Sequence, residues 1–166
     1  MEIRPYRPED LAACRELWRE LTQHHRDIYD DQSIGGADPG AHFDEYLAHP
    51  KFVGAWVAEA AGAIVGLTGL LGSGAEAEIE PVVVSAAHRA RGIGRRLIER
   101  MLAEARARGA QSVSIRPVAR NALAIRRFHE AGFRILGHIE MFQKLDPSAD
   151  PGWKPGLDLH GHAFRY

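Results

Sequence analysis

The sequence predicts an α/β or α+β domain built on a mixed sheet, and three observations support this prediction. Residues 52–59 and 63–71 are apolar runs separated by a short turn, which is the pattern of an antiparallel hairpin. A valine-rich run at 82–84 leads into a helical pattern and then into another strand-like segment, which is typical of a strand–helix–strand unit. The length of 166 residues and a hydrophobic fraction of 45% fit one globular domain.

The N-terminal part is expected to place two helices ahead of the hairpin. Leu11, Cys14 and Leu17 recur at helical spacing, and Pro8 stands near the start of that pattern, where proline is well tolerated. A polar segment at 26–41 is expected to be a loop. The elements predicted here are a strand at 2–7, helices at 8–25 and 42–48, and strands at 52–59 and 63–71.

The C-terminal part is expected to add four strands and two helices, for a total of about seven strands and about four helices. Gly109 and Gly132 follow helical patterns and are predicted to end them. The tail after residue 145 shows no pattern that predicts an element. The elements predicted here are strands at 76–84, 112–116, 133–136 and 139–145, and helices at 92–108 and 121–131.

The turn between the strand at 76–84 and the next helix is the most informative segment. Gly92 and Gly94 let the backbone approach a bulky ligand, and a helix start directs several N–H groups toward one point. Residues 89–108 hold seven arginines against two glutamates, a local excess of +5 in a chain whose net charge is −1. These features predict a site for a phosphate or pyrophosphate.

Two common nucleotide-binding motifs do not fit this turn. A dinucleotide-binding turn needs a third glycine near position 97, which is Leu97, and an acid about 20 residues further on, which is missing. A phosphate-binding Walker loop needs Gly-Lys-Ser/Thr, and no such tripeptide follows these glycines.

The pattern that remains is Arg89-x-x-Gly92-x-Gly94 after a valine strand, and it resembles the signature of the GNAT superfamily of acyl-CoA-dependent N-acetyltransferases. A second motif, from Asn121 through Phe128 to Gly132, follows in the order that the family shows. The resemblance implies a mixed, mostly antiparallel central sheet within a domain at 1–145, with 146–166 as an extension of unknown role.

The resemblance also implies acetyl-CoA as co-substrate. In the family, the matching turn holds the pyrophosphate, the matching strand pairs with the pantetheine arm, and the matching asparagine bonds that arm. Asn121 is also a good helix N-cap from its residue type. The cofactor-binding residues expected here are Val82, Val83, Val84, Arg89, Ala90, Arg91, Gly92, Ile93, Gly94, Arg95, Asn121 and Phe128.

Acetyl transfer to an amine needs a base, because an amine with a pKa near 10 is almost fully protonated at neutral pH. Glu80 is the expected base, and Glu78 is the second candidate. Strand alternation predicts that these glutamates share one face with Val82 and Val84, unless a bulge at Pro81 interrupts it. Many family members have tyrosine at the position of Phe128, where its hydroxyl protonates the leaving thiolate, so the acid is unassigned.

Several classes of function are not favoured. The charge balance gives no sign of a nucleic-acid or membrane partner, no apolar run could cross a membrane, and cytoplasmic residence is the default. We expect no metal site, because the paired histidines lack a matching third ligand. The acidic segment 27–45 could draw a cationic amine. The expected function is N-acetylation of a small-molecule, peptide or protein amine, with a homodimer left open. The alternative is a non-catalytic acyl-CoA sensor.

Overall fold

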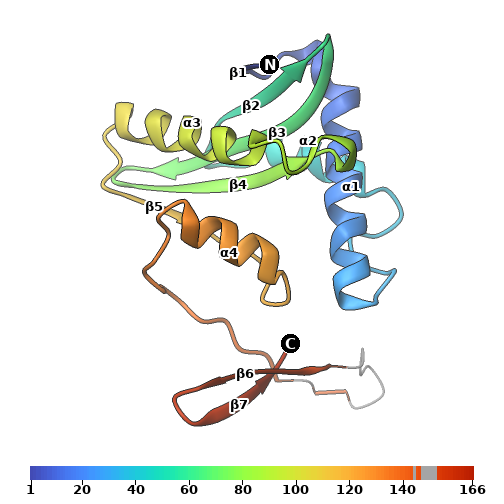
Figure 1. Ribbon diagram of the computed structural model, residues 1–166, viewed down its shortest axis with the longest axis vertical. Coiled ribbons are helices and arrows are strands. Elements are labelled where there is room, and N and C mark those ends of the chain that lie inside the picture. The colour runs from blue at the N-terminus through green and yellow to red at the C-terminus, as the bar shows by residue number, and fades with distance from the viewer. Residues whose placement is uncertain (144, 147–152) are drawn as a thin grey trace. The chain divides into compact units, whose positions relative to one another are not determined.

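The computed structural model describes residues 1–143, 145–146 and 153–166, which fall into two units, 1–116 and 117–166. The first unit is a five-stranded sheet (Figure 1) with the strand order β1-β2-β3-β4-β5. All neighbouring pairs are antiparallel except β4 and β5, which are parallel. The strands are β1 (Glu2–Pro5), β2 (Phe52–Ala60), β3 (Ala63–Ser73), β4 (Glu76–Val84) and β5 (Ser112–Ile115). The predicted class is confirmed, with five strands in the sheet in place of about seven.

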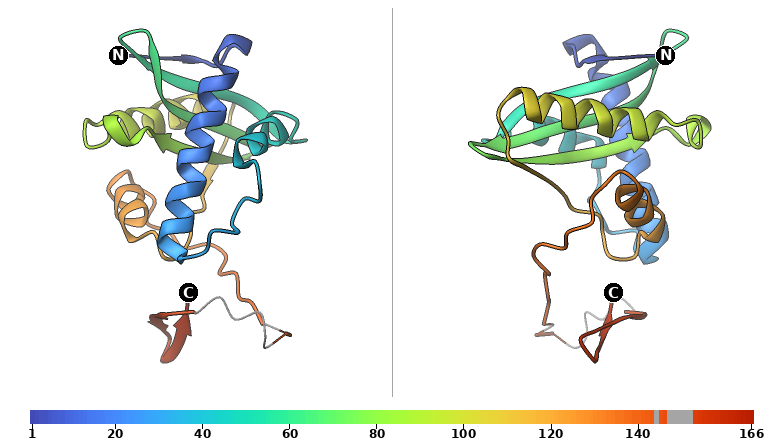
Figure 2. Two further views of the ribbon diagram at one scale, coloured as in Figure 1. Left: turned by 90° about the vertical axis from the view of Figure 1, so that its right-hand side faces the viewer. Right: turned by 60° about the vertical axis from the view of Figure 1, so that its left-hand side comes forward.

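Two long helices cover opposite faces of this sheet, as the two views of Figure 2 show. One face packs against α1 and α2, in a core that includes Cys14, Phe43 and Leu67. The other face packs against α3, through Leu97 and its neighbours. The helices are α1 (Leu11–Tyr29), α2 (His42–Leu47) and α3 (Ile93–Ala107), with single 3₁₀ turns η1 (Pro8–Asp10), η2 (Pro39–Ala41) and η3 (Ala86–His88).

Helix α3 follows its sequence signals closely, whereas α1 is longer than expected. Gly92 is the N-cap of α3, and Gly109 ends it with a φ of 82°. Helix α1 continues four residues past the expected end at 25 and stops at Asp30, whose φ is 56°. The thiol of Cys14 is buried in the core, and burial raises its pKa to about 12, so it remains protonated.

A buried ion pair fixes the start of the chain against the sheet. The Arg4 guanidinium donates to the Asp10 carboxylate at 2.7 Å and to Glu59 of β2 at 2.8 Å. Asp10 is buried, and the hydrogen bond from Arg4 holds the pKa of its carboxyl below the usual value. These contacts join β1, the start of α1 and β2 in one network.

The second unit consists of α4 (Ala122–Glu130) and an antiparallel hairpin of β6 (Pro155–Leu159) and β7 (His162–Arg165). The predicted strands at 133–136 and 139–145 are wrong for the described residues; residue 144 lies outside them. Ile135, Leu136 and Leu145 are 85–94% exposed there. Apolar alternation is a local signal, but a strand also needs a partner edge to complete its hydrogen bonds. Among the described residues, no helix is long and apolar enough to span a bilayer.

Candidate active site

The turn ahead of α3 has the backbone geometry of an anion site. Ala90 and Gly92 both have positive φ, 60° and 78°, and a Cβ at Gly92 would meet no atom within 4 Å. Within the described chain, the N–H groups of 90–92 donate no backbone hydrogen bond. The N–H groups of 93–95 belong to the first turn of α3, where a helix offers no backbone acceptor, and the first helical bond is from the Arg96 N–H to the Gly92 carbonyl. Six successive N–H groups are therefore available to one ligand, which fits a pyrophosphate.

Side chains hold this turn in place from both ends. The Glu20 carboxylate of α1 accepts a hydrogen bond from the Ala86 N–H at 2.8 Å. The Arg89 Nε donates to the Val84 carbonyl at 3.1 Å, so this arginine also braces the turn. His24 lies close enough to Arg89 for its charge, together with burial, to lower the pKa of the imidazole. The C-terminal half of α1 therefore supports the turn.

Beyond the turn, β4 is paired with β5 along only part of its length. The parallel ladder covers Glu76 to Ile79 and then stops. From Glu80 to Val84, the edge of β4 on the β5 side has no ladder partner among the described residues. An unpaired strand edge presents N–H and C=O groups at regular spacing, so an extended amide-containing ligand can bind there. The expected role of 82–84 toward the pantetheine arm stays a prediction.

A β-bulge interrupts β4 at the same point. The register with β3 shifts by one residue between Thr68 and Leu70, so that Gly69 faces both Glu80 and Pro81. The extra residue bends the strand locally and redirects the side chains that follow it. The expected irregularity at Pro81 is thus present, and it separates the paired half of β4 from the unpaired half.

Because of the bulge, Glu78 and Val82 lie on opposite faces of the sheet. Glu78 pairs with Leu71, and Val82 pairs with Thr68. Leu71 and Thr68 are three positions apart on β3, and since side chains alternate between the two faces of a strand, an odd separation places them on opposite faces. Leu71 belongs to the core under α1 and α2, so Glu78 is on that side. Regular alternation would place Glu78, Glu80, Val82 and Val84 on one face, and the bulge at Pro81 breaks that alternation, which is the exception that the sequence left open.

The environment of Glu80 suits a base. Its side chain keeps contact with solvent, while the surrounding protein desolvates the carboxylate enough to raise its pKa. The charge of Glu78 raises the pKa further, and Arg116 and His49 oppose these effects. A carboxylate that is partly desolvated but still accessible binds a proton more strongly than an exposed one.

Glu78 has a different partner and a different exposure. It forms a bidentate ion pair with Arg116, which follows β5, and its side chain is only 17% exposed. A carboxylate engaged in this way is a weaker candidate for a base. Its charge and that of Arg116 act on Glu80 in opposite directions, so the pair adjusts the proton affinity of the neighbouring carboxylate.

Sequence reasoning missed Tyr46, which α2 places at the bulge. Its hydroxyl is buried and has no hydrogen-bond partner among the described residues; burial raises its pKa, and the charges of Glu80 and Glu78 raise it further. A Cβ at Gly69 would overlap this hydroxyl and stand 2.7 Å from the Glu80 carbonyl oxygen. The signal that could have indicated this contact is a glycine inside an otherwise apolar strand.

The two remaining predicted residues belong to the second unit. The Asn121 Oδ1 accepts a hydrogen bond from the Ala124 N–H at 3.0 Å, so this residue caps α4. Phe128 packs edge-on against Phe133, with ring centroids 6.4 Å apart. These contacts give both residues a structural role within their own unit.

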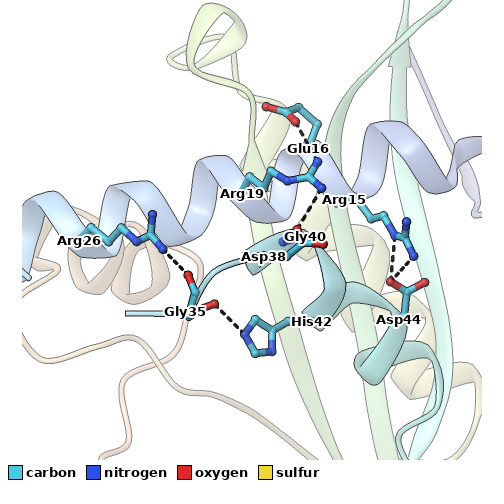
Figure 3. Close-up of polar contacts among 10 residues, drawn as sticks. Arg15, Glu16, Arg19, Arg26, Gly35, Asp38, Gly40, His42 and Asp44 are labelled. Atoms are coloured by element: carbon cyan, nitrogen blue, oxygen red, sulfur yellow. Dashed lines mark hydrogen bonds and ion pairs between the residues drawn. The ribbon is translucent and has the colours of Figure 1, made fainter. Parts of the chain in front are cut away.

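Two arginines of α1 form ion pairs with acidic residues of the segment 27–45, as Figure 3 shows. Arg15 pairs with Asp44 at 2.7 Å and Arg19 pairs with Asp38 at 3.1 Å. Arg26 donates to backbone carbonyls of the loop before α2. The segment is thereby tied to α1.

Other features of the described residues lie away from this site. A cavity of about 200 Å³ lies at the far end of α3 from the turn, beside Ala105 and Arg108. In the part of the chain that the structure describes, no three His, Cys, Asp or Glu side chains are grouped as metal ligands would be.

Comparison with known proteins identifies the family. Residues 11–133 match the model of the acetyltransferase (GNAT) family. An L-methionine sulfoximine/L-methionine sulfone acetyltransferase from Salmonella typhimurium is 28% identical over 146 residues, which cover 84% of this chain and 83% of the relative.

Solved structures show the same fold. An aminoglycoside N-acetyltransferase in complex with CoA has a TM-score of 0.66 at 18% identity, covering 87% of this chain and 95% of that chain. A GNAT family acetyltransferase from Brucella melitensis in complex with acetyl-CoA has a TM-score of 0.56 at 24% identity, covering 76% and 80%. The chain therefore belongs to the GNAT family: it is an acetyltransferase, and acetyl-CoA is its co-substrate.

Proposed function

We propose that this protein transfers the acetyl group of acetyl-CoA to a primary amine of a small molecule, with Glu80 as the general base. The observation that carries the proposal is the position of Glu80 at the bulge, where β4 leaves β5 and where the pKa of the carboxyl is raised. A base is useful at this point because the amine must lose a proton before it can attack a carbonyl carbon.

Binding of the co-substrate is assigned to backbone groups. The N–H groups of 90–95 hold the pyrophosphate, and the unpaired edge of 82–84 hydrogen-bonds the pantetheine arm. Acetyl-CoA supplies a thioester that is activated toward attack by an amine. An N–H group of the same strand edge donates to the carbonyl oxygen, where negative charge develops during the attack.

The proton leaves the amine toward Glu80, directly or through one water. Ionised Glu80 accepts it, and its raised pKa makes it a stronger base than an exposed glutamate. Phe128 has no hydroxyl to protonate the departing thiolate, so that proton comes from solvent. The charges of Glu78 and Glu80 also attract a cationic amine to the bulge.

The acceptor is assigned to the small-molecule class on two grounds. The Salmonella typhimurium relative is an acetyltransferase for two small molecules, L-methionine sulfoximine and L-methionine sulfone. Arg15 and Arg19 of α1 pair with Asp44 and Asp38, which reduces the negative charge that segment 27–45 offers to a basic peptide.

Thiol release from acetyl-CoA tests this function directly. The purified protein is offered small amines, amino-acid analogues, polyamines, aminoglycosides and peptides, and free thiol is measured. We expect release with at least one small amine. Release only with peptides would move the acceptor to the protein class, and acetyl-CoA binding without release from any amine would indicate a sensor.

A further inference from the structure

Tyr46 carries a hydroxyl that the fold itself does not use. The residue is 6% exposed, and its ring packs against Trp18, Phe43 and Phe52 with centroid distances of 5.5–6.4 Å. The hydroxyl has no hydrogen-bond partner in the structure. A phenylalanine would make the same ring contacts without burying an unsatisfied polar group, which costs free energy. The packing therefore does not explain why this position has a hydroxyl.

The position of the hydroxyl indicates a role beside the base. It lies over Gly69: a Cβ at position 69 would overlap the hydroxyl oxygen and stand 2.7 Å from the Glu80 carbonyl oxygen, so only glycine leaves this space open. Burial raises the pKa of the phenol, and the charges of Glu80 and Glu78 raise it further, so the hydroxyl keeps its proton and can donate it in a hydrogen bond. It does not contact the Glu80 carboxylate directly, because the contacts of the structure include no such bond.

We propose that Tyr46 is a positioning residue whose hydroxyl holds the water through which Glu80 receives the proton of the amine. The hydroxyl donates to the water oxygen, and the water donates to the Glu80 carboxylate, with the Glu80 carbonyl as a further acceptor nearby. When the amine attacks, its proton passes to the water while the water gives a proton to the carboxylate. The water is regenerated, and Glu80 leaves the step protonated. The inference rests on the proposed function.

This arrangement makes Tyr46 act through Glu80, so the two residues should not contribute independently. A bound water with two or three fixed polar partners positions a proton transfer almost as well as a direct contact. Removing the hydroxyl leaves the water with fewer partners, and the hydrogen bond that it transmits to the ionised carboxylate is weakened. The base then becomes both less well placed and easier to protonate.

The variant Tyr46→Phe tests the proposal, with Tyr6→Phe as its matched control. Tyr6 belongs to the same aromatic cluster and contacts Phe43, but the charges that act on it come from Asp10, Asp44 and Arg15 rather than from Glu78 and Glu80. We expect Tyr46→Phe to lower kcat about tenfold or more. We also expect it to move the acid limb of the rate profile to higher pH, with an unchanged KM for acetyl-CoA and an unchanged or higher Tm. Tyr6→Phe should keep the wild-type kcat and pH profile.

A double mutant separates this inference from the proposed function. If Tyr46 acts through Glu80, adding Tyr46→Phe to Glu80→Gln costs nothing further, because the proton acceptor is already gone. The inference would be overturned if Tyr46→Phe lowered kcat by the same factor in the Glu80→Gln background as in the wild type. It would also be overturned if Glu80→Gln were slow while Tyr46→Phe alone kept the wild-type kcat and pH profile. Wild-type turnover in Glu80→Gln alone would instead overturn the proposed base.

Discussion

The hydroxyl of Tyr46 lies directly over Gly69, so that a Cβ at position 69 would overlap it. This contact joins α2 to β3 at the point where β4 bulges and the pairing with β5 ends. The phenol, the bulge and the Glu80 backbone carbonyl are therefore brought together by one close approach that only glycine permits.

The first prediction concerns that approach. Gly69→Ala should destabilise the protein by about 2 kcal/mol, because the new methyl overlaps a buried hydroxyl and stands 2.7 Å from a backbone carbonyl that cannot swing aside. The measurement is urea unfolding. Gly72→Ala on the same strand is the control, since its Cβ would meet a valine methyl at 3.2 Å and needs only a small adjustment. Equal losses in the two variants would contradict the described packing.

The second prediction concerns the anion site. Gly92→Asp should weaken acetyl-CoA binding strongly, because it places a carboxylate where the pyrophosphate is expected. Gly62→Asp separates this effect from backbone strain: Gly62 has the same φ of 78° and equally open surroundings, but it lies in the β2–β3 turn. Calorimetry should show a loss of affinity for Gly92→Asp only. Equal affinities in both variants would rule out this turn as the phosphate site.

The third prediction concerns the pH dependence of the reaction. The charge of Glu78 raises the pKa of Glu80, and the charge of Arg116 lowers it. Glu78→Gln should therefore move the acid limb of the rate profile to lower pH, and Arg116→Gln should move it to higher pH. Shifts in the same direction would contradict the assignment of the limb to Glu80.

The fourth prediction concerns the stability of the N-terminal network. Asp10→Asn should lower the free energy of unfolding by about 3 kcal/mol at neutral pH, since it leaves Arg4 without its main partner in a buried site. The pKa of Asp10 is lowered by folding, so its contribution is present at neutral pH and is lost as pH falls through the folded-state value.

Two further measurements check this interpretation. The difference between wild type and Asp10→Asn should shrink below a pH of about 4, where Asp10 begins to protonate in the unfolded chain. Glu16→Gln removes an exposed partner of Arg19 and should cost less than about 1 kcal/mol. A difference between Asp10→Asn and wild type that persists undiminished in acid would assign the loss to packing rather than to charge.

The sequence predicted the features that depend on local signals. The start of α3 at Gly92, its end at Gly109 and the cap at Asn121 each follow from one residue type in one conformation. The Arg/Gly turn is also local, because its N–H groups belong to consecutive residues. These parts of the fold could be recognised without knowing which segments meet in space.

The features that the sequence did not predict depend on pairing between distant segments. The offset that places Glu78 and Val82 on opposite faces exists only in the register of β4 against β3. Tyr46 reaches Gly69 only because α2 packs on that face. The exposed segment around Ile135 has an apolar composition typical of a strand, but no edge among the described residues pairs with it.

The stability of a Glu80 variant can be anticipated as well. Because the folded-state pKa of Glu80 is raised, its ionised form opposes folding at neutral pH, and Glu80→Gln should match or exceed the Tm of the wild type. Loss of activity in this variant therefore cannot be attributed to unfolding.

The most direct test of the account is the rate of thiol release by Glu80→Gln across pH, with an amine that the wild type accepts. The wild-type rate should fall in acid with a midpoint above the ordinary pKa of glutamate. The variant should be slower at neutral pH by a factor on the order of 10²–10⁴ and should lack that acid limb, with acetyl-CoA affinity unchanged. A variant that retains the wild-type rate and pH dependence would show that Glu80 is not the base.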